Sequence, residues 1–300
     1  MRFGIMAMQL EALVPPGVPG EQVMANILGF DHAGLAKSLF DKGFNPIELG
    51  GDLGMFLPHV YNPDAIGKLA ALKAEGVTYT VHLPLWSVEP STPLTPVRQG
   101  SVQAVVDTVK ATLPLEPEVY VLHATGALAA EFYNMKISET ARTIILRQFQ
   151  NGARESIKSI LAETGLPSRK LAIETIEFPL DLTLELADEL DLSICLDTGH
   201  VLAGFPGWFD FFDVVERILP RLAEVHLHDS KQMPEGRRGY GEDHKPLGQG
   251  DLALGHFLDR LAEANFSGPL VFELKVDEAL ESLKVIRSLR SQFIQKTDPL

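Results

Sequence analysis

Short apolar runs in this chain end repeatedly in histidine, aspartate or glutamate. The two clearest are residues 194–200, with the sequence ICLDTGH, and residues 225–229, with the sequence VHLHD. Further apolar runs end in residues of the same kinds, namely His82, His123, Glu174 and Glu273. Buried strands with such ends are typical of parallel barrels, in which the active site lies at the carboxyl ends of the strands. The pattern therefore predicts a polynuclear metal site at the mouth of a barrel.

The order of the segments predicts the same architecture. Short apolar runs alternate with longer amphipathic ones, as in successive βα units. We expect strands at 2–7, 46–49, 78–82, 119–123, 171–174, 193–197, 223–227 and 270–274. We expect helices at 33–42, 63–74, 101–112, 139–164, 182–190, 211–218, 252–264 and 276–293. Because the chain has 300 residues and no linker, we predict an α/β fold in which residues 1–300 form one (β/α)8 TIM barrel.

Long loops follow some of the expected strands, at residues 8–29, 50–62 and 228–251. The first two are rich in apolar residues and proline, whereas the third contains Arg237, Arg238 and Tyr240. Long loops in a compact domain usually serve function, so these either cover a substrate or pack over the barrel rim. The aromatic stretch 204–212 fits core packing, a pocket wall or a subunit contact.

The charge balance limits the classes of partner. Lysine and arginine number 26 against 40 acidic residues, which gives a net charge of −14. Because such a surface repels nucleic-acid backbones, we expect no nucleic-acid partner. The single cysteine, Cys195, cannot form an internal disulfide, which fits a reducing compartment. No apolar run approaches the roughly 20 residues that span a bilayer, and the first residues lack a cleavable signal. We expect a cytoplasmic protein of undetermined oligomeric state.

The mixture of imidazole and carboxylate suits Zn, Mn, Fe or Co better than Ca or Mg. Asp197 and His200 are three residues apart where a strand turns into its loop, so both can point inward. His226 and His228 are two apart and share one face of a strand. His226 is the better metal ligand, whereas His228 or the adjacent Asp229 would orient a ligand or contact the substrate. Each histidine alone is more often a buried structural residue, but together they favour ligation.

These residues resemble the pattern of the xylose isomerase-like barrel superfamily, and more closely its endonuclease IV branch, known for a trinuclear zinc site. The correspondence includes D-T-x-H at 197–200, H-x-x-D at 226–229 and the loop stretch 242–250. The resemblance implies two or three divalent ions, zinc in the first place and Mn, Fe or Co as alternatives. It implies the metal ligands His82, His123, Glu174, Asp197, His200, His226, Glu242, His244 and Glu273. Glu242 stands where the family has aspartate and is one methylene longer, with Asp243 beside it.

The resemblance also indicates the chemistry. Sugar isomerases of the superfamily need only a Glu, Asp, His, Glu subset, so the additional histidines favour phosphoester hydrolysis. Water activated by several close cations would attack phosphorus in line. Glu174 would bridge the metals, and Glu273 would ligate a metal and orient the water, which makes these two the expected catalytic residues. On the substrate side we expect Glu48, His228, Arg237, Arg238 and Tyr240.

The acidic charge and the apolar rim favour a bulky small-molecule phosphodiester over DNA. Within the superfamily, the cobamide-remodelling phosphodiesterases match this description. They cut the nucleotide-loop phosphoester of a cobamide and release cobinamide phosphate and an α-riboside, which is our most specific hypothesis. The alternatives are an abasic-site endonuclease, a metal-dependent sugar isomerase or epimerase, and a non-catalytic ligand-binding barrel.

Overall fold

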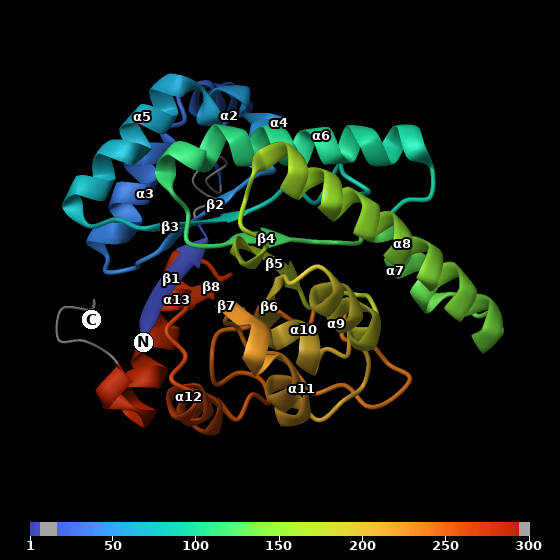
Figure 1. The fold of residues 1–300 in the computed structure, drawn as a ribbon. Helices are drawn as coiled ribbons and strands as arrows, with labels where there is room; N and C mark the ends of the chain where they lie inside the picture. Colours follow the sequence, from blue (N-terminus) through green and yellow to red (C-terminus); the bar gives the residue numbers. More distant parts are fainter. Residues whose placement is uncertain (7–16, 294–300) are drawn as a thin grey trace.

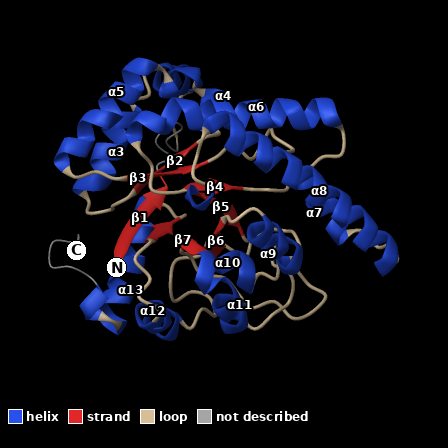
Figure 2. Ribbon diagram, in the orientation of Figure 1, coloured by secondary structure: helices blue, strands red, loops and turns tan. Residues whose placement is uncertain are grey.

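The strands close into a parallel barrel in chain order. In the computed structural model, which describes residues 1–6 and 17–293, each strand pairs with its neighbours in sequence and the first pairs with the last. The strands are β1 (Arg2–Met6), β2 (Ile47–Gly50), β3 (Tyr79–His82), β4 (Tyr120–Leu122), β5 (Leu171–Glu174), β6 (Ser193–Asp197), β7 (Leu222–His226) and β8 (Pro269–Phe272). Figure 2 shows them at the centre of a shell of helices. The prediction of a (β/α)8 TIM barrel is confirmed.

Helices cover the outside of the barrel (Figure 1). Those at the expected places are α3 (His32–Asp41), α5 (Pro63–Leu72), α6 (Thr95–Thr112), α8 (Glu139–Thr164), α9 (Leu180–Glu189), α11 (Phe211–Ile218), α12 (Leu254–Glu263) and α13 (Val276–Leu289). Helix α6 begins six residues earlier than the expected 101. The reason is that Pro96 fits the first turn, where the missing N–H would have no intrahelical partner.

Several elements lie outside the expected set. Short 3-10 turns lie outside it at η3 (Leu113–Leu115), η4 (Ser168–Lys170) and η5 (Leu219–Arg221). Two others, η2 (Lys73–Glu75) and η6 (Ser291–Phe293), form the ends of the helices expected at 63–74 and 276–293. Helix α7 (Ala127–Asn134) follows β4 after four intervening residues, and α10 (Thr198–Leu202) follows β6 directly. Helix α10 begins at the strand end because the Asp197 carboxylate accepts the backbone N–H of His200 at 2.6 Å and so caps the helix.

Two of the expected long loops contain helices. Helix α2 (Gly20–Leu28) lies in the first loop and has no buried residue, whereas residues 7–16 lie outside the described part of the chain. The second loop contains α4 (Leu53–Phe56) and η1 (Pro58–Tyr61). Leu53, Leu57 and Val60 form a small buried cluster there, and Ile27 of α2 and Phe30 pack against it. The second loop therefore packs against the first.

The third long loop, 228–251, is organised around one buried carboxylate. Asp229 accepts backbone N–H groups from Ser230 at 2.9 Å, Gly248 at 2.8 Å and Leu252 at 3.0 Å. These bonds join the two ends of the loop. Asp229 therefore stabilises the loop. Backbone N–H groups occupy its oxygens, so it does not have the substrate contact that was one of the two roles expected for it.

Alternation along each strand separates two environments. Ile47, Leu49 and Val81 belong to the main apolar core together with helix residues such as Leu39 and Val105. Inside the barrel the side chains are smaller or polar. Val121, Ala172 and Cys195 pack together there, and the fully buried polar side chains at the same depth are Glu48, Thr80 and Glu224. Polar residues inside the barrel thus reach below the strand ends.

Among the residues that the structure describes, no helix is both long and apolar enough to cross a membrane. The cytoplasmic location stays a prediction.

Candidate metal centre

The strand ends bring the expected ligand residues together at one mouth of the barrel. His82, Glu174, Asp197 and His226 are the last residues of β3, β5, β6 and β7. His123 and Glu273 follow β4 and β8 directly. Asp197 pairs with His226 in the register between β6 and β7, so neighbouring strands present their ligand-type residues at one level.

The Glu174 carboxylate is surrounded by imidazoles. Its Oε2 atom lies 3.2 Å from His82 Nε2 and 2.9 Å from His123 Nε2. Its Oε1 atom lies 3.3 Å from His200 Nδ1 and 3.6 Å from His226 Nδ1. Glu174 is buried, so one carboxylate faces four imidazoles with little access of water.

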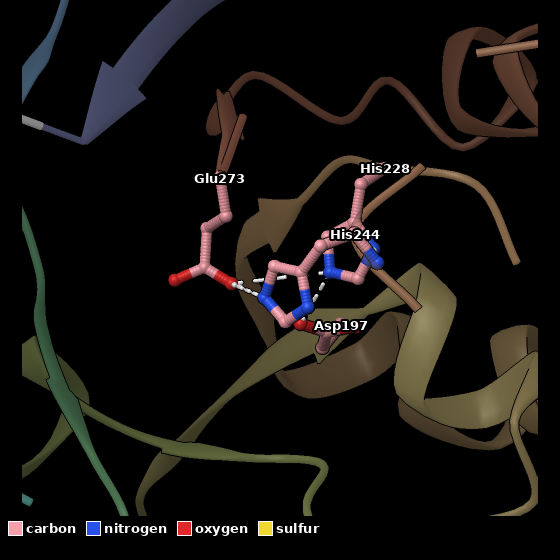
Figure 3. Close-up of side chains that lie close together, drawn as sticks. All are labelled: Asp197, His228, His244 and Glu273. Atoms are coloured by element: carbon pink, nitrogen blue, oxygen red, sulfur yellow. Dashed lines mark hydrogen bonds and ion pairs between the residues drawn. The ribbon is translucent and has the colours of Figure 1, made fainter. Parts of the chain in front are cut away.

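A second group is formed by Asp197, His228, His244 and Glu273 (Figure 3). The rings of His228 and His244 stack with their centroids 4.1 Å apart and their planes inclined by 12°. His228 Nε2 lies 2.9 Å from Asp197 Oδ2, and His244 Nε2 lies 3.3 Å from Glu273 Oε2. The two rings thus link the carboxylate at the end of β6 with the carboxylate after β8.

Hydrogen bonds to the second ring nitrogen fix which nitrogen faces the centre. Nδ1–H of His82 donates to the Leu83 carbonyl at 3.0 Å, which leaves Nε2 toward Glu174. In His228 the order is reversed, because Nδ1 accepts the backbone N–H of His244 at 2.9 Å. Nε2 of a neutral His228 therefore carries the proton and donates to Asp197. His228 is fully buried, so it orients Asp197 and does not reach a substrate as the sequence had suggested.

The carboxylates and imidazoles shift one another's pKa in opposite directions. Burial disfavours a protonated His82, but the hydrogen bond and charge of Glu174 outweigh it and raise the pKa of His82 to about 9. The pKa of His200 is likewise raised to about 9, against burial, by the charge of Asp197 and by Glu174. Burial opposes ionisation of Glu174, yet the surrounding imidazoles hold its pKa well below the usual range. The cluster therefore needs protons or cations among its anions.

The donor set fits divalent cations. Ligand-type atoms of Glu174, Asp197, His226 and Glu273 all lie within 4.8 Å of one another. Overlapping groups with the same spacing are His82–Glu174–His226, His200–Asp243–His244, Glu48–Glu224–His226 and Asp197–His228–His244–Glu273. In the last of these, His228 orients Asp197 and offers no free lone pair. Both ring nitrogens of His226 are buried without a hydrogen-bond partner among the described residues, as expected of a side chain shaped to ligate. A mixture of imidazole nitrogen and carboxylate oxygen suits divalent transition metals.

Glu242 is the predicted ligand that the structure does not bring to the cluster. Its carboxylate forms an ion pair with Lys245. Asp243 lies in its place, with Oδ2 2.8 Å from His244 Nδ1 and 3.8 Å from His200 Nε2. His244 and His200 outweigh burial and lower the pKa of Asp243 to about 2. The loop turns sharply here, since Gly241 and His244 have positive φ angles of 75° and 55°, and this turn directs Asp243 inward.

Glu48 was expected on the substrate side, and the structure places it elsewhere. Its side chain is fully buried inside the barrel, with Oε1 3.3 Å from His226 Nε2. Glu224 lies beside it and was not identified from the sequence. Burial, followed by the charge of Glu48, raises the pKa of Glu224 well above its usual range. Glu224 stands two residues before His226 on the same strand face, which is the signal that could have revealed it.

A cavity of about 280 Å³ opens beside His123 and His200. Trp86, Phe205, Glu177 and Thr125 are among its lining residues, so Phe205 of the aromatic stretch serves as a pocket wall. No lysine or arginine is among the residues that line it. The cavity therefore lies between aromatic walls and the imidazoles of the cluster.

The remaining substrate-side predictions lie at the rim. Tyr240 is exposed, and its ring lies 5.3 Å from that of Phe205. Arg238 is bonded to Asn134 and lies over the Tyr133 and Trp208 rings, 4.3 Å and 4.8 Å from their centroids. Arg237 is exposed, and neither arginine lines the cavity. Of the three, only Tyr240 contacts a cavity wall.

Comparison with known proteins agrees with this architecture. A curated relative is an uncharacterized protein of Methanocaldococcus jannaschii, 25% identical over 239 residues that cover 76% of each chain. Among solved structures, a D-tagatose 3-epimerase-like protein has a TM-score of 0.69 and 19% identity, with 97% of this chain and 98% of that chain covered. Endonuclease IV of Thermus thermophilus has a TM-score of 0.65 and 19% identity, with 97% and 100% covered.

These structural similarities concern the fold. The family description that matches the chain is xylose isomerase-like TIM barrel, and the match extends over residues 37–291. An epimerase-like protein, an epimerase and an endonuclease are among the solved structures with this fold. The chain therefore belongs to the xylose isomerase-like TIM barrel family.

Proposed function

We propose that this protein is a divalent-metal-dependent phosphodiesterase that acts on a small molecule. The observation that carries the proposal is the sharing of carboxylates between overlapping ligand groups. Glu174, Asp197 and Glu273 each belong to more than one group. One ion would be satisfied by a single group, so shared carboxylates favour two or three close ions, most simply zinc.

Divalent ions held there would supply an activated water and neutralise phosphoryl charge. The residues of the chain would hold the ions in place and orient the water molecule. Glu174 lies between His82 and His123 on one side and His200 and His226 on the other, so its two oxygens would help to hold more than one ion. Glu273 lies between buried His226 and half-exposed His244, where its carboxylate can orient a water molecule and accept its proton.

The surroundings of the centre favour a small substrate over a nucleic acid. The net charge is −14, and the cavity beside His123 has the ring walls Trp86 and Phe205 without a basic lining residue. A volume of about 280 Å³ accommodates one ring-sized substituent. In a cobamide, our specific candidate, the base of the lower-ligand riboside would occupy this cavity and the ribose and corrin would lie outside it.

An elemental count of bound metal per chain, followed by assays of two substrates, tests the proposal. Two or three ions per chain and turnover of bis(4-nitrophenyl) phosphate support hydrolysis. Release of cobinamide phosphate from a cobamide, detected by mass spectrometry, supports the specific substrate. Nicking of an abasic duplex without cobamide cleavage would instead favour the endonuclease alternative.

A sugar epimerase is the second candidate. It is favoured by the group Glu174, Asp197, His226 and Glu273, which would suffice for one ion and includes two glutamates that can exchange a proton. Solved structures similar in fold include a 3-keto-D-glucoside 4-epimerase from E. coli, with a TM-score of 0.66 and 15% identity. One ion per chain, with deuterium from D₂O incorporated into a ketose, would replace the hydrolase proposal.

A further inference from the structure

The layer beneath the metal centre holds polar side chains that the proposed reaction does not use. Glu48, Thr80 and Glu224 are fully buried on β2, β3 and β7. The Thr80 hydroxyl lies 3.0 Å from Glu48 Oε2 and 3.1 Å from Glu224 Oε1. This hydroxyl therefore holds the far oxygen of Glu48 and leaves Oε1 to face another group. None of these residues lines the cavity beside His123.

Glu48 Oε1 faces the ring of His226. The distance from Oε1 to Nε2 is 3.3 Å, and neither atom has a hydrogen-bond partner of good geometry among the described residues. On the other edge of the ring, Nδ1 lies 3.4 Å from Glu273 Oε1 and 3.6 Å from Glu174 Oε1. A buried polar atom without a partner is unfavourable, so a small rotation of the His226 ring that lets Nε2–H donate to Glu48 is favourable.

We propose that Glu48 is a positioning residue of the metal centre. Its Oε1 accepts the Nε2–H of His226 and so directs the Nδ1 lone pair toward the ion held with Glu174 and Glu273. Metal-bound imidazoles usually donate their second N–H to a carboxylate or carbonyl, which fixes the tautomer and the ring orientation. The inference rests on the metal-binding part of the proposed function and holds for hydrolysis and epimerisation alike.

Two substitutions of nearly equal shape separate this role from simple packing. Glu48→Met keeps the length of the side chain and removes both acceptors. Glu48→Gln keeps one acceptor for His226 and offers amide N–H groups to Thr80 and Glu224. Zinc affinity of the full chain, measured by competition with a chromophoric chelator, is expected to fall about 10- to 100-fold in Glu48→Met. It should fall only slightly in Glu48→Gln, and the number of ions at saturation should not change in either.

The tautomer of His226 gives a readout that packing alone would not alter. In the ¹⁵N-labelled, zinc-saturated protein, we expect the proton on Nε2 to be downfield and protected from exchange. Protection should persist in Glu48→Gln and be lost in Glu48→Met. Thr80→Val disturbs the same buried layer but leaves the acceptor, so it is the matched control and should keep the Nε2 proton.

Equal zinc affinity of the unaltered protein and a folded Glu48→Met variant would overturn the proposal. Loss of one whole ion at saturation would also overturn it, because Glu48 would then be a ligand. If Glu48→Met does not fold, the tautomer of His226 in the unaltered zinc-bound protein still tests the proposal. A proton on Nδ1 instead of Nε2 would contradict the role of Glu48. An unaltered protein that binds no divalent ion overturns both this role and the metal centre, which distinguishes the two failures.

Discussion

The metal centre has a strand-borne side and a loop-borne side, and the two are held differently. Glu174, Asp197 and His226 end strands and expose at most 1% of their side chains. Asp243 and His244 lie on the loop between β7 and α12, and 44% of the His244 side chain is exposed. Ligands on strands inherit the rigidity of the barrel, whereas ligands on the loop depend on a few local bonds.

The local bonds of the loop side are identifiable. The His244 backbone has a φ of 55°, in the left-handed region that non-glycine residues rarely adopt. Its N–H donates to His228 Nδ1, and Asp229 ties the loop ends together. We therefore expect the strand side to bind an ion firmly and the loop side to exchange one readily.

The largest expected effect is that of Glu174→Gln on the strand side. The substitution keeps the shape but removes the charge that faces four imidazoles. We expect the variant to lose about 4 kcal/mol of transition-state stabilisation, which lowers the rate roughly a thousandfold. Phosphodiesterase rate and bound metal per chain are the measurements. A variant with full activity and full metal content would show that the centre does not depend on its buried carboxylate.

A smaller effect is expected for His244→Asn on the loop side. Asparagine tolerates the left-handed backbone, so the substitution isolates the loss of the imidazole beside Glu273. We expect the loss of one ion and a decrease of about 2 kcal/mol in transition-state stabilisation, roughly thirtyfold in rate. Elemental analysis after gel filtration measures the first and steady-state kinetics the second. Equal losses in His244→Asn and Glu174→Gln would remove the distinction between the two sides.

Asp243→Asn tests which loop carboxylate belongs to the centre. The variant loses a charge that faces both His244 and His200. We expect transition-state stabilisation to decrease by about 1 kcal/mol, which lowers the rate roughly fivefold. Glu242→Gln is the matched control, because Glu242 pairs with Lys245 outside the ligand groups. Its rate should equal that of the unaltered protein. The opposite ranking of the two variants would return the ligand role to Glu242.

The same division explains what the sequence could predict. On strands, a period of two fixes which residues face inward, so apolar runs ending at His82, Glu174, Asp197 and Glu273 sufficed to locate the site. On the loop, the choice between Glu242 and Asp243 depends on backbone turns at Gly241 and His244. These turns follow from long-range bonds, such as those of Asp229, which the neighbouring residues do not determine.

The misplacement of Glu48 has a different physical reason. The run before it predicts an inward-facing strand residue, which is correct. Its depth in the barrel depends on the register of β2 against β3, where Glu48 pairs with Thr80 and Gly50 with His82. Glu48 therefore lies one inward layer below His82. A single strand carries no information about this stagger, so the residue was assigned to the substrate instead of to the barrel interior.

The pH dependence of stability separates the metal-free from the metal-bound centre. Without metal, the pKa values of His82 and His200 are raised to about 9, above an unfolded value of about 6.5. Each raised pKa favours the fold by up to about 3 kcal/mol. This contribution is fully present below pH ~6.5 and is lost as pH rises through about 9, because the folded state binds more protons in that window.

We therefore expect the Tm of chelator-treated protein to fall by several degrees between pH 6.5 and 9.5. Zinc-saturated protein should lack this decline, because the metal replaces the protons on the imidazoles. Differential scanning calorimetry with and without chelator measures both profiles. His200 reports on the strand-borne side, since its Nδ1 faces Glu174 and Asp197. A decline of equal size in the zinc-saturated protein would mean that the imidazoles keep their protons and are not ligands, because a nitrogen lone pair cannot hold a proton and a metal at once.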